Sequence, residues 1–198
     1  DAAVDRTKDS GADPSLVAEA LLVRARVRRA NGDDKGATRD LLRALPIATS
    51  VRRRDIEAAA TAELAHLLAE SGQLEAATDH ARRASLAYRD AGDRAREAVA
   101  AAHAGDLERR RGHVDEARAA IERALPLDQT EEVLAAALRL FLQINDDKAL
   151  YGTISRARAK PGRSAIQEAA LFLVEGVTLH DRGEATAARE RYAAADAL

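Results

Sequence analysis

The 198-residue chain contains no cysteine, which excludes disulfides and thiolate metal sites and leaves the redox compartment open. Methionine and tryptophan are also absent, and aromatic residues make up only 3% of the chain. A core of alanine, leucine and valine packs helices closely but leaves few large pockets for a small molecule. We therefore expect no cofactor.

The chain has almost equal numbers of basic and acidic residues, 31 and 33, and its net charge is −2. The arginine clusters, such as Arg52–Arg54 and Arg109–Arg111, have acidic neighbours and no interleaved aromatics for base stacking. No apolar run approaches the roughly 18 residues that span a bilayer, and no signal peptide opens the chain. We expect no nucleic-acid or membrane partner and a cytoplasmic location.

Catalytic and metal-binding motifs are missing as well. The five histidines follow no His-Glu-x-x-His pattern and are scattered along the chain: His66, His80, His103, His113 and His180. There is no glycine-rich phosphate loop and no serine in a nucleophile elbow. The sequence predicts neither a metal site nor an enzyme.

What the sequence does contain is a repeat. Gly32, Gly72 and Gly112 recur at intervals of 40 (72 − 32; 112 − 72), and Asn145 and Gly183 continue the series. Alanine stands five and twelve residues after nearly every one of these turn residues, with a further apolar residue between, nine after the turn. Steps of four and three are helical spacing, and the same period before each turn indicates a second helix.

Small residues and prolines support helix pairs. Gly105 and Gly176 lie seven residues before their turns, where glycine costs a helix roughly 1 kcal/mol relative to alanine. We expect a neighbouring helix to contact them, and Gly176→Ala to stabilise only if there is room for a methyl group. The prolines are expected at helix boundaries, and they are Pro14, Pro46, Pro126 and Pro161.

These residues resemble the tetratricopeptide repeat family, in a bacterial variant with a period near 40. The series Gly105, Gly112, Ala117 and Ala124 is the clearest match, and the resemblance covers residues 16 to 198. It implies an all-α protein, a right-handed α-solenoid of five helix-turn-helix units. The first unit departs from the family pattern at Arg24 and Arg28, which stand at positions that are more often apolar.

The predicted organisation begins with the tail of an upstream helix or a linker at residues 1–14. The units that follow are 15–53, 54–92, 93–128, 129–162 and 163–198. The missing initiator methionine and the helix-like residues at both ends suggest an excised part of a larger signalling or regulatory protein. The alanine content and the excess of arginine over lysine suggest a bacterial source. The first function hypothesis is a non-catalytic scaffold that binds a protein or peptide segment. The alternative is a structural module that self-associates through its open ends.

The resemblance implies that the first helix of each pair lines a concave groove. The binding residues expected there are Arg26, His66, Asp106, Arg109, Arg110, Arg139 and Gln143. The arginines cluster in the third and fourth units, above a floor expected at Ala102 and Ala135. We therefore expect a segment with acidic or C-terminal carboxylate groups, held by charge-assisted hydrogen bonds.

Overall fold

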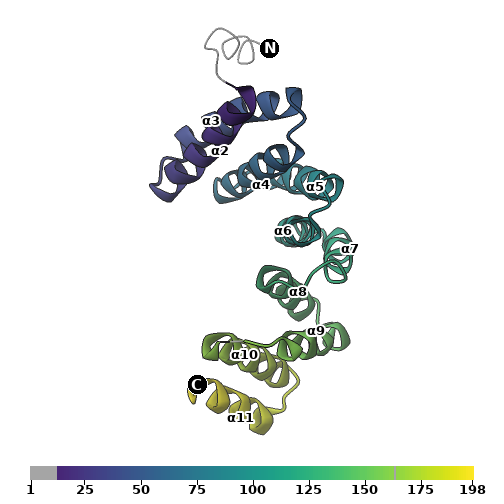
Figure 1. Ribbon diagram of the computed structural model, residues 1–198. Helices are drawn as coiled ribbons and strands as arrows, with labels where there is room; N and C mark the ends of the chain where they lie inside the picture. The colour runs from purple at the N-terminus through teal and green to yellow at the C-terminus, as the bar shows by residue number, and fades with distance from the viewer. Residues whose placement is uncertain (1–12, 163) are drawn as a thin grey trace. The chain divides into compact units, whose positions relative to one another are not determined.

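A computed structural model describes residues 13–162 and 164–198, and this part of the chain forms ten α-helices and no strand (Figure 1). The helices of the first three pairs are α2 (Pro14–Ala30) and α3 (Asp34–Ser50), α4 (Arg54–Glu70) and α5 (Leu74–Asp90), and α6 (Arg94–Arg111) and α7 (Val114–Ala124). Those of the last two are α8 (Glu131–Gln143) and α9 (Asp147–Ala159), and α10 (Ala165–Asp181) and α11 (Ala185–Asp196). The predicted ten-helix, all-α repeat architecture is confirmed for these residues.

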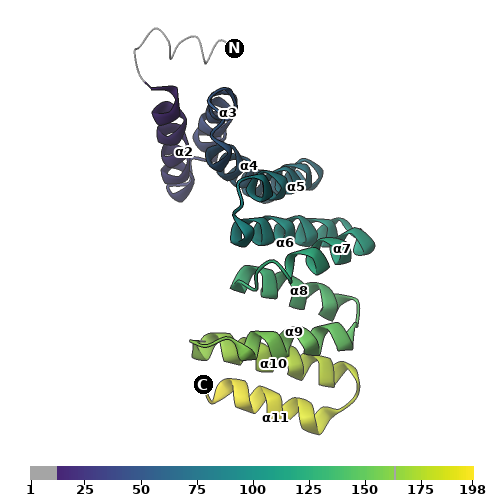
Figure 2. The same cartoon turned by 45° about the vertical axis from the view of Figure 1, so that its right-hand side comes forward.

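The helix pairs belong to two compact units. The first unit comprises residues 1–130 and the second residues 131–198. First helices of successive pairs contact each other directly within each unit. In the first unit α2 packs on α4, and in the second unit α8 packs on α10 (Figure 2). Residues 1–12, which carry most of the predicted N-terminal tail, lie outside the described residues. The predicted unit boundaries and the right-handed sense of the array stay predictions.

The turn inside each pair has the expected left-handed residue. Gly112 has φ 85° and Asn145, which replaces glycine in the fourth pair, has φ 54°. Asparagine tolerates this region better than other residues with a side chain, which explains the substitution. The turns that follow α3, α5 and α9 also contain a left-handed residue, and these residues are Arg52 at φ 57°, Gly92 at φ 75° and Gly162 at φ 78°.

The predicted contact points at the helix glycines are confirmed. A Cβ added to Gly105 would lie 3.0 Å from Cγ1 of Ile121, and one added to Gly176 would lie 2.5 Å from Cε1 of Tyr192. Each neighbour lies on the second helix of the same pair. Glycine at these positions therefore allows the close approach of α6 to α7 and of α10 to α11.

Pro46 corrects one prediction, because it lies inside α3 and not at a helix boundary. A proline there removes one backbone hydrogen bond and normally bends or ends a helix. The helix continues for another turn because Ile47 and Ala48, directly after the proline, are buried in the hydrophobic core of the first unit. Packing outweighs the local preference.

The two arginines that depart from the family pattern pair with a buried acid. Asp40 on α3, whose side chain is 1% exposed, accepts hydrogen bonds from Arg24 at 2.7 Å and from Arg28 at 2.8 Å. The guanidinium of Arg24 lowers the pKa of the Asp40 carboxyl. In the last pair the charges are exchanged, since buried Glu175 on α10 faces Arg191 on α11 at 3.4 Å. Arg24 and Glu175 each stand eight residues before their turn glycine, and Asp40 and Arg191 each stand eight after it.

Candidate functional site

The first helices of the first unit place most of the predicted binding residues on one face, which we call the first-helix face. It is lined by α2, α4 and α6 (Figure 1). Arg26 on α2 donates a hydrogen bond to Glu63 on α4 at 2.9 Å. One turn further along α2, Arg29 bonds Glu63 at 3.1 Å and Glu70 at 2.6 Å. The arginines of α2 are thus paired with carboxylates of the next first helix.

His66 on α4 stacks on His103 on α6, with ring centroids 4.1 Å apart and an angle of 13° between the ring planes. Burial lowers the pKa of both imidazoles, and that of His103 falls to about 4, with the neighbouring His66 ring adding to the effect. Both rings are therefore neutral at pH 7. The sequence analysis treated these histidines as scattered, whereas the fold brings them together.

Asp106, Arg109 and Arg110 lie on α6. Arg109 donates to Asp106 one turn earlier, at 3.1 Å between Nε and Oδ1. Arg110 is exposed, and its guanidinium reaches the carbonyl oxygen of Ala69 at the end of α4, at 3.5 Å. Much of the positive charge on the first-helix face is therefore balanced by the carboxylates of neighbouring first helices and by Asp106.

The second unit holds the other two predicted binding residues, Arg139 and Gln143, which are both exposed on α8. The expected floor differs between the units. Ala102 in the first unit is buried, with 1% of its surface exposed, so it offers no open floor. Ala135 in the second unit lines an open pocket.

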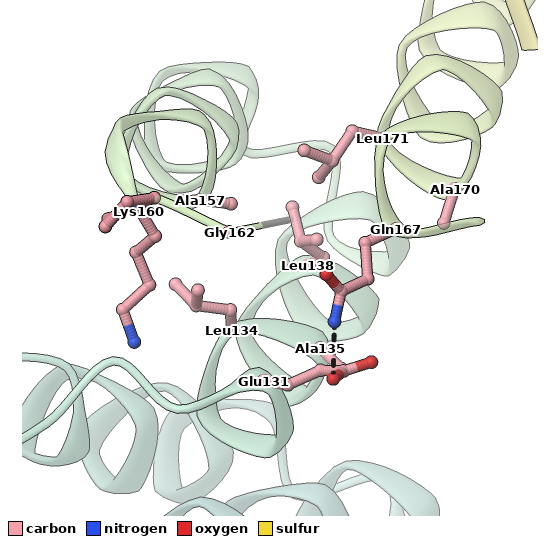
Figure 3. A pocket seen from close by; sticks show the side chains of 11 residues that line it. Glu131, Leu134, Ala135, Leu138, Ala157, Lys160, Gly162, Gln167, Ala170 and Leu171 are labelled. Atoms are coloured by element: carbon pink, nitrogen blue, oxygen red, sulfur yellow. Dashed lines mark hydrogen bonds between the residues drawn. The ribbon is translucent and has the colours of Figure 1, made fainter. Parts of the chain in front are cut away.

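This pocket lies between α8, the end of α9 and α10, and has a volume of about 310 Å³ (Figure 3). Its walls are mainly apolar, and the side chains that form them are Leu134, Ala135, Leu138, Ala157, Ala170 and Leu171. At one edge the amide of Gln167 donates to the carboxylate of Glu131 at 2.7 Å. Lys160 lines the pocket on the opposite side, beyond Leu134 (Figure 3).

Of the residues that line this pocket, only Ala135 was expected from the sequence to contact a ligand. Leu134, Leu138 and Leu171 were not among the binding residues expected from the sequence. The pocket depends on the connection from α9 to α10, where Lys160, Pro161 and Gly162 complete the wall. The signal in the sequence was Leu138, because the equivalent residues of the other four units are alanine or glycine, at positions 25, 65, 105 and 176.

Residues 13–162 and 164–198 contain neither a metal-binding cluster nor a membrane-spanning helix. No group of three or more histidine, aspartate and glutamate side chains is arranged to hold a metal ion there. None of the helices in that part of the chain is long and apolar enough to cross a bilayer.

Comparison with known proteins shows similarity in structure alone. No protein-family model matches the sequence, and no curated protein sequence does. The crystal structure of BtubC (BKLC) from P. vanneervenii is 17% identical, with a TM-score of 0.77 over 98% of this chain and 84% of that one. The TPR-like repeats of a putative kinesin light chain from Podosopora anserina are 18% identical, with a TM-score of 0.71 over 93% of this chain and 95% of that one. The chain therefore has the fold of a tetratricopeptide-like helical-repeat solenoid.

Proposed function

We propose that this chain is a non-catalytic interaction scaffold that holds a polypeptide segment at the pocket of the second unit. The observation that carries the proposal is the open apolar pocket between α8 and α10, in a chain whose other helices meet largely through alanine. Ligand pockets usually have volumes of about 300–1,000 Å³. A pocket of about 310 Å³ suits an aliphatic side chain of a bound segment better than a large cofactor.

The pocket has Glu131 at one edge and Lys160 on the opposite side, and the acidic group of the segment is proposed to lie on the Lys160 side. Lys160 lines one side, and exposed Arg139 follows directly after the pocket residue Leu138. A bound segment that inserts an aliphatic side chain between Leu134 and Leu171 would place a neighbouring or C-terminal carboxylate near these cations. The predicted acidic character of the ligand is thus kept, with Arg139 as its recognition residue in the second unit. The setting in a larger bacterial signalling protein stays a prediction.

The test starts from a random peptide library selected on the immobilised chain, followed by affinity measurement of one selected peptide by fluorescence polarisation. Ala170→Trp fills the pocket from an exposed position on α10, so the fold is kept. We expect it to weaken binding at least tenfold, and Arg139→Ala to weaken binding and its dependence on salt. The matched control is Ala119→Trp, at an exposed alanine beside a different hollow in the first unit.

We expect Ala170→Trp to weaken peptide binding and Ala119→Trp to leave it unchanged. Wild-type affinity in Ala170→Trp, together with a loss in Ala119→Trp, would move the ligand to the first unit. Failure of every selected peptide to bind the chain in solution would contradict a role in binding peptide segments.

A further inference from the structure

The two charged residues at the pocket of the second unit stand where the other repeats have apolar residues. Glu131 lies fourteen residues before the turn residue Asn145 (145 − 131), and Lys160 lies fifteen residues after it (160 − 145). The residues equivalent to Glu131 in the other four units are all alanine, at positions 18, 58, 98 and 169. Those equivalent to Lys160 are Ile47, Ala87, Leu127 and Leu198. The helical repeat therefore requires neither charge, yet both line the same pocket.

Glu131 is fixed at the edge of this pocket by hydrogen bonds that lead back to the start of α10. The backbone N–H of Ser164 donates to Oε1 of Gln167 at 2.9 Å, and the backbone N–H of Gln167 donates to the hydroxyl oxygen of Ser164 at 3.2 Å. This capping box orients the Gln167 amide, whose Nε2 donates to Glu131 at 2.7 Å (Figure 3). A carboxylate that is already held in place loses little freedom when it binds a ligand.

The hydrogen bond from Gln167 leaves the negative charge of Glu131 in place, because an amide is neutral. A carboxylate offers about four lone-pair sites to hydrogen-bond donors, and the Gln167 amide uses one of them. Glu131 is exposed to solvent and lies across the pocket from Lys160 (Figure 3). The two sides of one apolar pocket therefore differ in the sign of their charge.

We infer, on the basis of the peptide binding proposed for this pocket, that the bound segment carries a lysine or arginine side chain that pairs with Glu131. The aliphatic side chain of the segment fills the pocket, the basic side chain lies on the Glu131 side, and the acidic group lies on the Lys160 side. Every second side chain of an extended segment points to the same face. The basic and acidic residues therefore lie two positions to either side of the aliphatic residue.

The test is selection from a random peptide library on the immobilised chain and, in parallel, on Glu131→Lys. Constant glycine-serine flanks keep both peptide termini away from the pocket, so a basic group comes from a side chain. We expect peptides selected on the wild type to have lysine or arginine on one side of an aliphatic residue and an acidic residue on the other. Peptides selected on Glu131→Lys are expected to have acidic residues on both sides, because both edges are then cationic.

A second measurement isolates the pair of charges. Replacement of the basic residue of one selected peptide by serine is expected to weaken binding to the wild type about fivefold, because a charge-assisted hydrogen bond is lost. The same replacement is expected to leave the affinity for Glu131→Gln unchanged, since this variant keeps an acceptor for Gln167 but not the charge. The matched control is Glu132→Gln, at an exposed neighbouring glutamate outside the pocket, and it behaves like the wild type.

The outcomes separate this inference from the proposed function. Selected peptides that bind with an aliphatic and an acidic residue but no enriched basic residue would overturn the inference and leave the proposed function in place. Equal losses with the wild type and with Glu131→Gln would also overturn it, because the basic residue would then have another partner. If no peptide binds, the proposed function fails together with the inference.

Discussion

At the scale of single residues, the ring of Tyr192 requires glycine at position 176. An added Cβ would lie within 2.5 to 3.1 Å of three ring atoms, so the space for one methyl group is not there. Gly152 on α9, in the same unit, has no neighbouring atom within 4 Å of an added Cβ. The two glycines are a matched pair that differs in packing.

We expect Gly176→Ala to lower the free energy of unfolding by about 1 kcal/mol, because overpacking of about 1–3 kcal/mol exceeds the gain of about 1 kcal/mol in helix propensity. Gly152→Ala is expected to raise it by about 1 kcal/mol. Urea denaturation of both variants beside the parent measures the difference. Equal stabilisation by the two alanines would show that α11 does not press on Gly176.

A second residue-scale prediction uses the exchanged charges of the first and last pairs. Asp40→Arg places a third cation at a buried position beside Arg24 and Arg28. Because these two arginines are 50% and 32% exposed, we expect the free energy of unfolding to fall by less than the cost of about 3–5 kcal/mol for a fully buried pair. Arg24→Glu combined with Asp40→Arg copies the arrangement of Glu175 and Arg191 and is expected to recover part of that loss. A double-mutant cycle by thermal denaturation measures the coupling. Additive losses would show that the pair contributes no specific interaction.

At the scale of helices, the histidine stack makes the contact of α4 with α6 sensitive to pH. The pKa of His103 is about 4 in the folded chain and that of His66 is lowered too, against about 6.5 in the unfolded chain. Below pH 6.5 the unfolded chain therefore binds protons that the folded chain does not. Stability is full above that pH and falls as the pH falls towards 4. The charged groups that act on the two rings are Arg29, Glu63, Glu70, Asp106 and Arg110.

We expect the free energy of unfolding to fall by up to about 1.4 kcal/mol per pH unit between pH 6.5 and 5 because of His103, and the lowered pKa of His66 adds to the fall in the same direction. Urea titrations across this range measure the slope. In His66→Gln with His103→Gln the slope is expected to decrease. The explanation fails if the double variant keeps the slope of the parent, because other groups would then be responsible.

Most of the helix framework was predictable because apolar periodicity and turn glycines are local signals. Asn145 was placed correctly in the series although it is not a glycine, because the surrounding repeat identifies the position. Pro46 could not be placed inside a helix from its own preference, because the burial of Ile47 decides its context. Arg24 and Arg28 occupy positions that are more often apolar in the family, and their hydrogen bonds to Asp40 explain why charged residues are tolerated there.

The candidate site was less predictable for a related reason. The spacing from each turn identified the first-helix face, but it did not show that Arg26 and Arg109 have carboxylate partners. The pocket of the second unit depends on the distance between α8 and α10 and on the path of the chain at Pro161. The helix distance and the chain path depend on how side chains pack, so they cannot be predicted from the spacing of residues in the sequence.

At the scale of the whole molecule, the chain consists of a first unit whose helices meet largely through alanine and a second unit with an open, mainly apolar pocket. The first-helix face of the first unit is occupied by its own ion pairs and ring stack, so its side chains already contact one another. The second unit has apolar surface available for a partner. We therefore propose that a bound polypeptide segment lies at the pocket of residues 131–198.

The most direct measurement of this claim is methyl NMR of the chain, labelled in leucine, isoleucine and alanine, during titration with a selected acidic peptide. The account predicts that the methyl signals of Leu134, Leu138 and Leu171 shift as the peptide binds, while those of Leu41 and Ile121 in the first unit stay in place. Shifts confined to the methyl groups of the first unit would contradict the account.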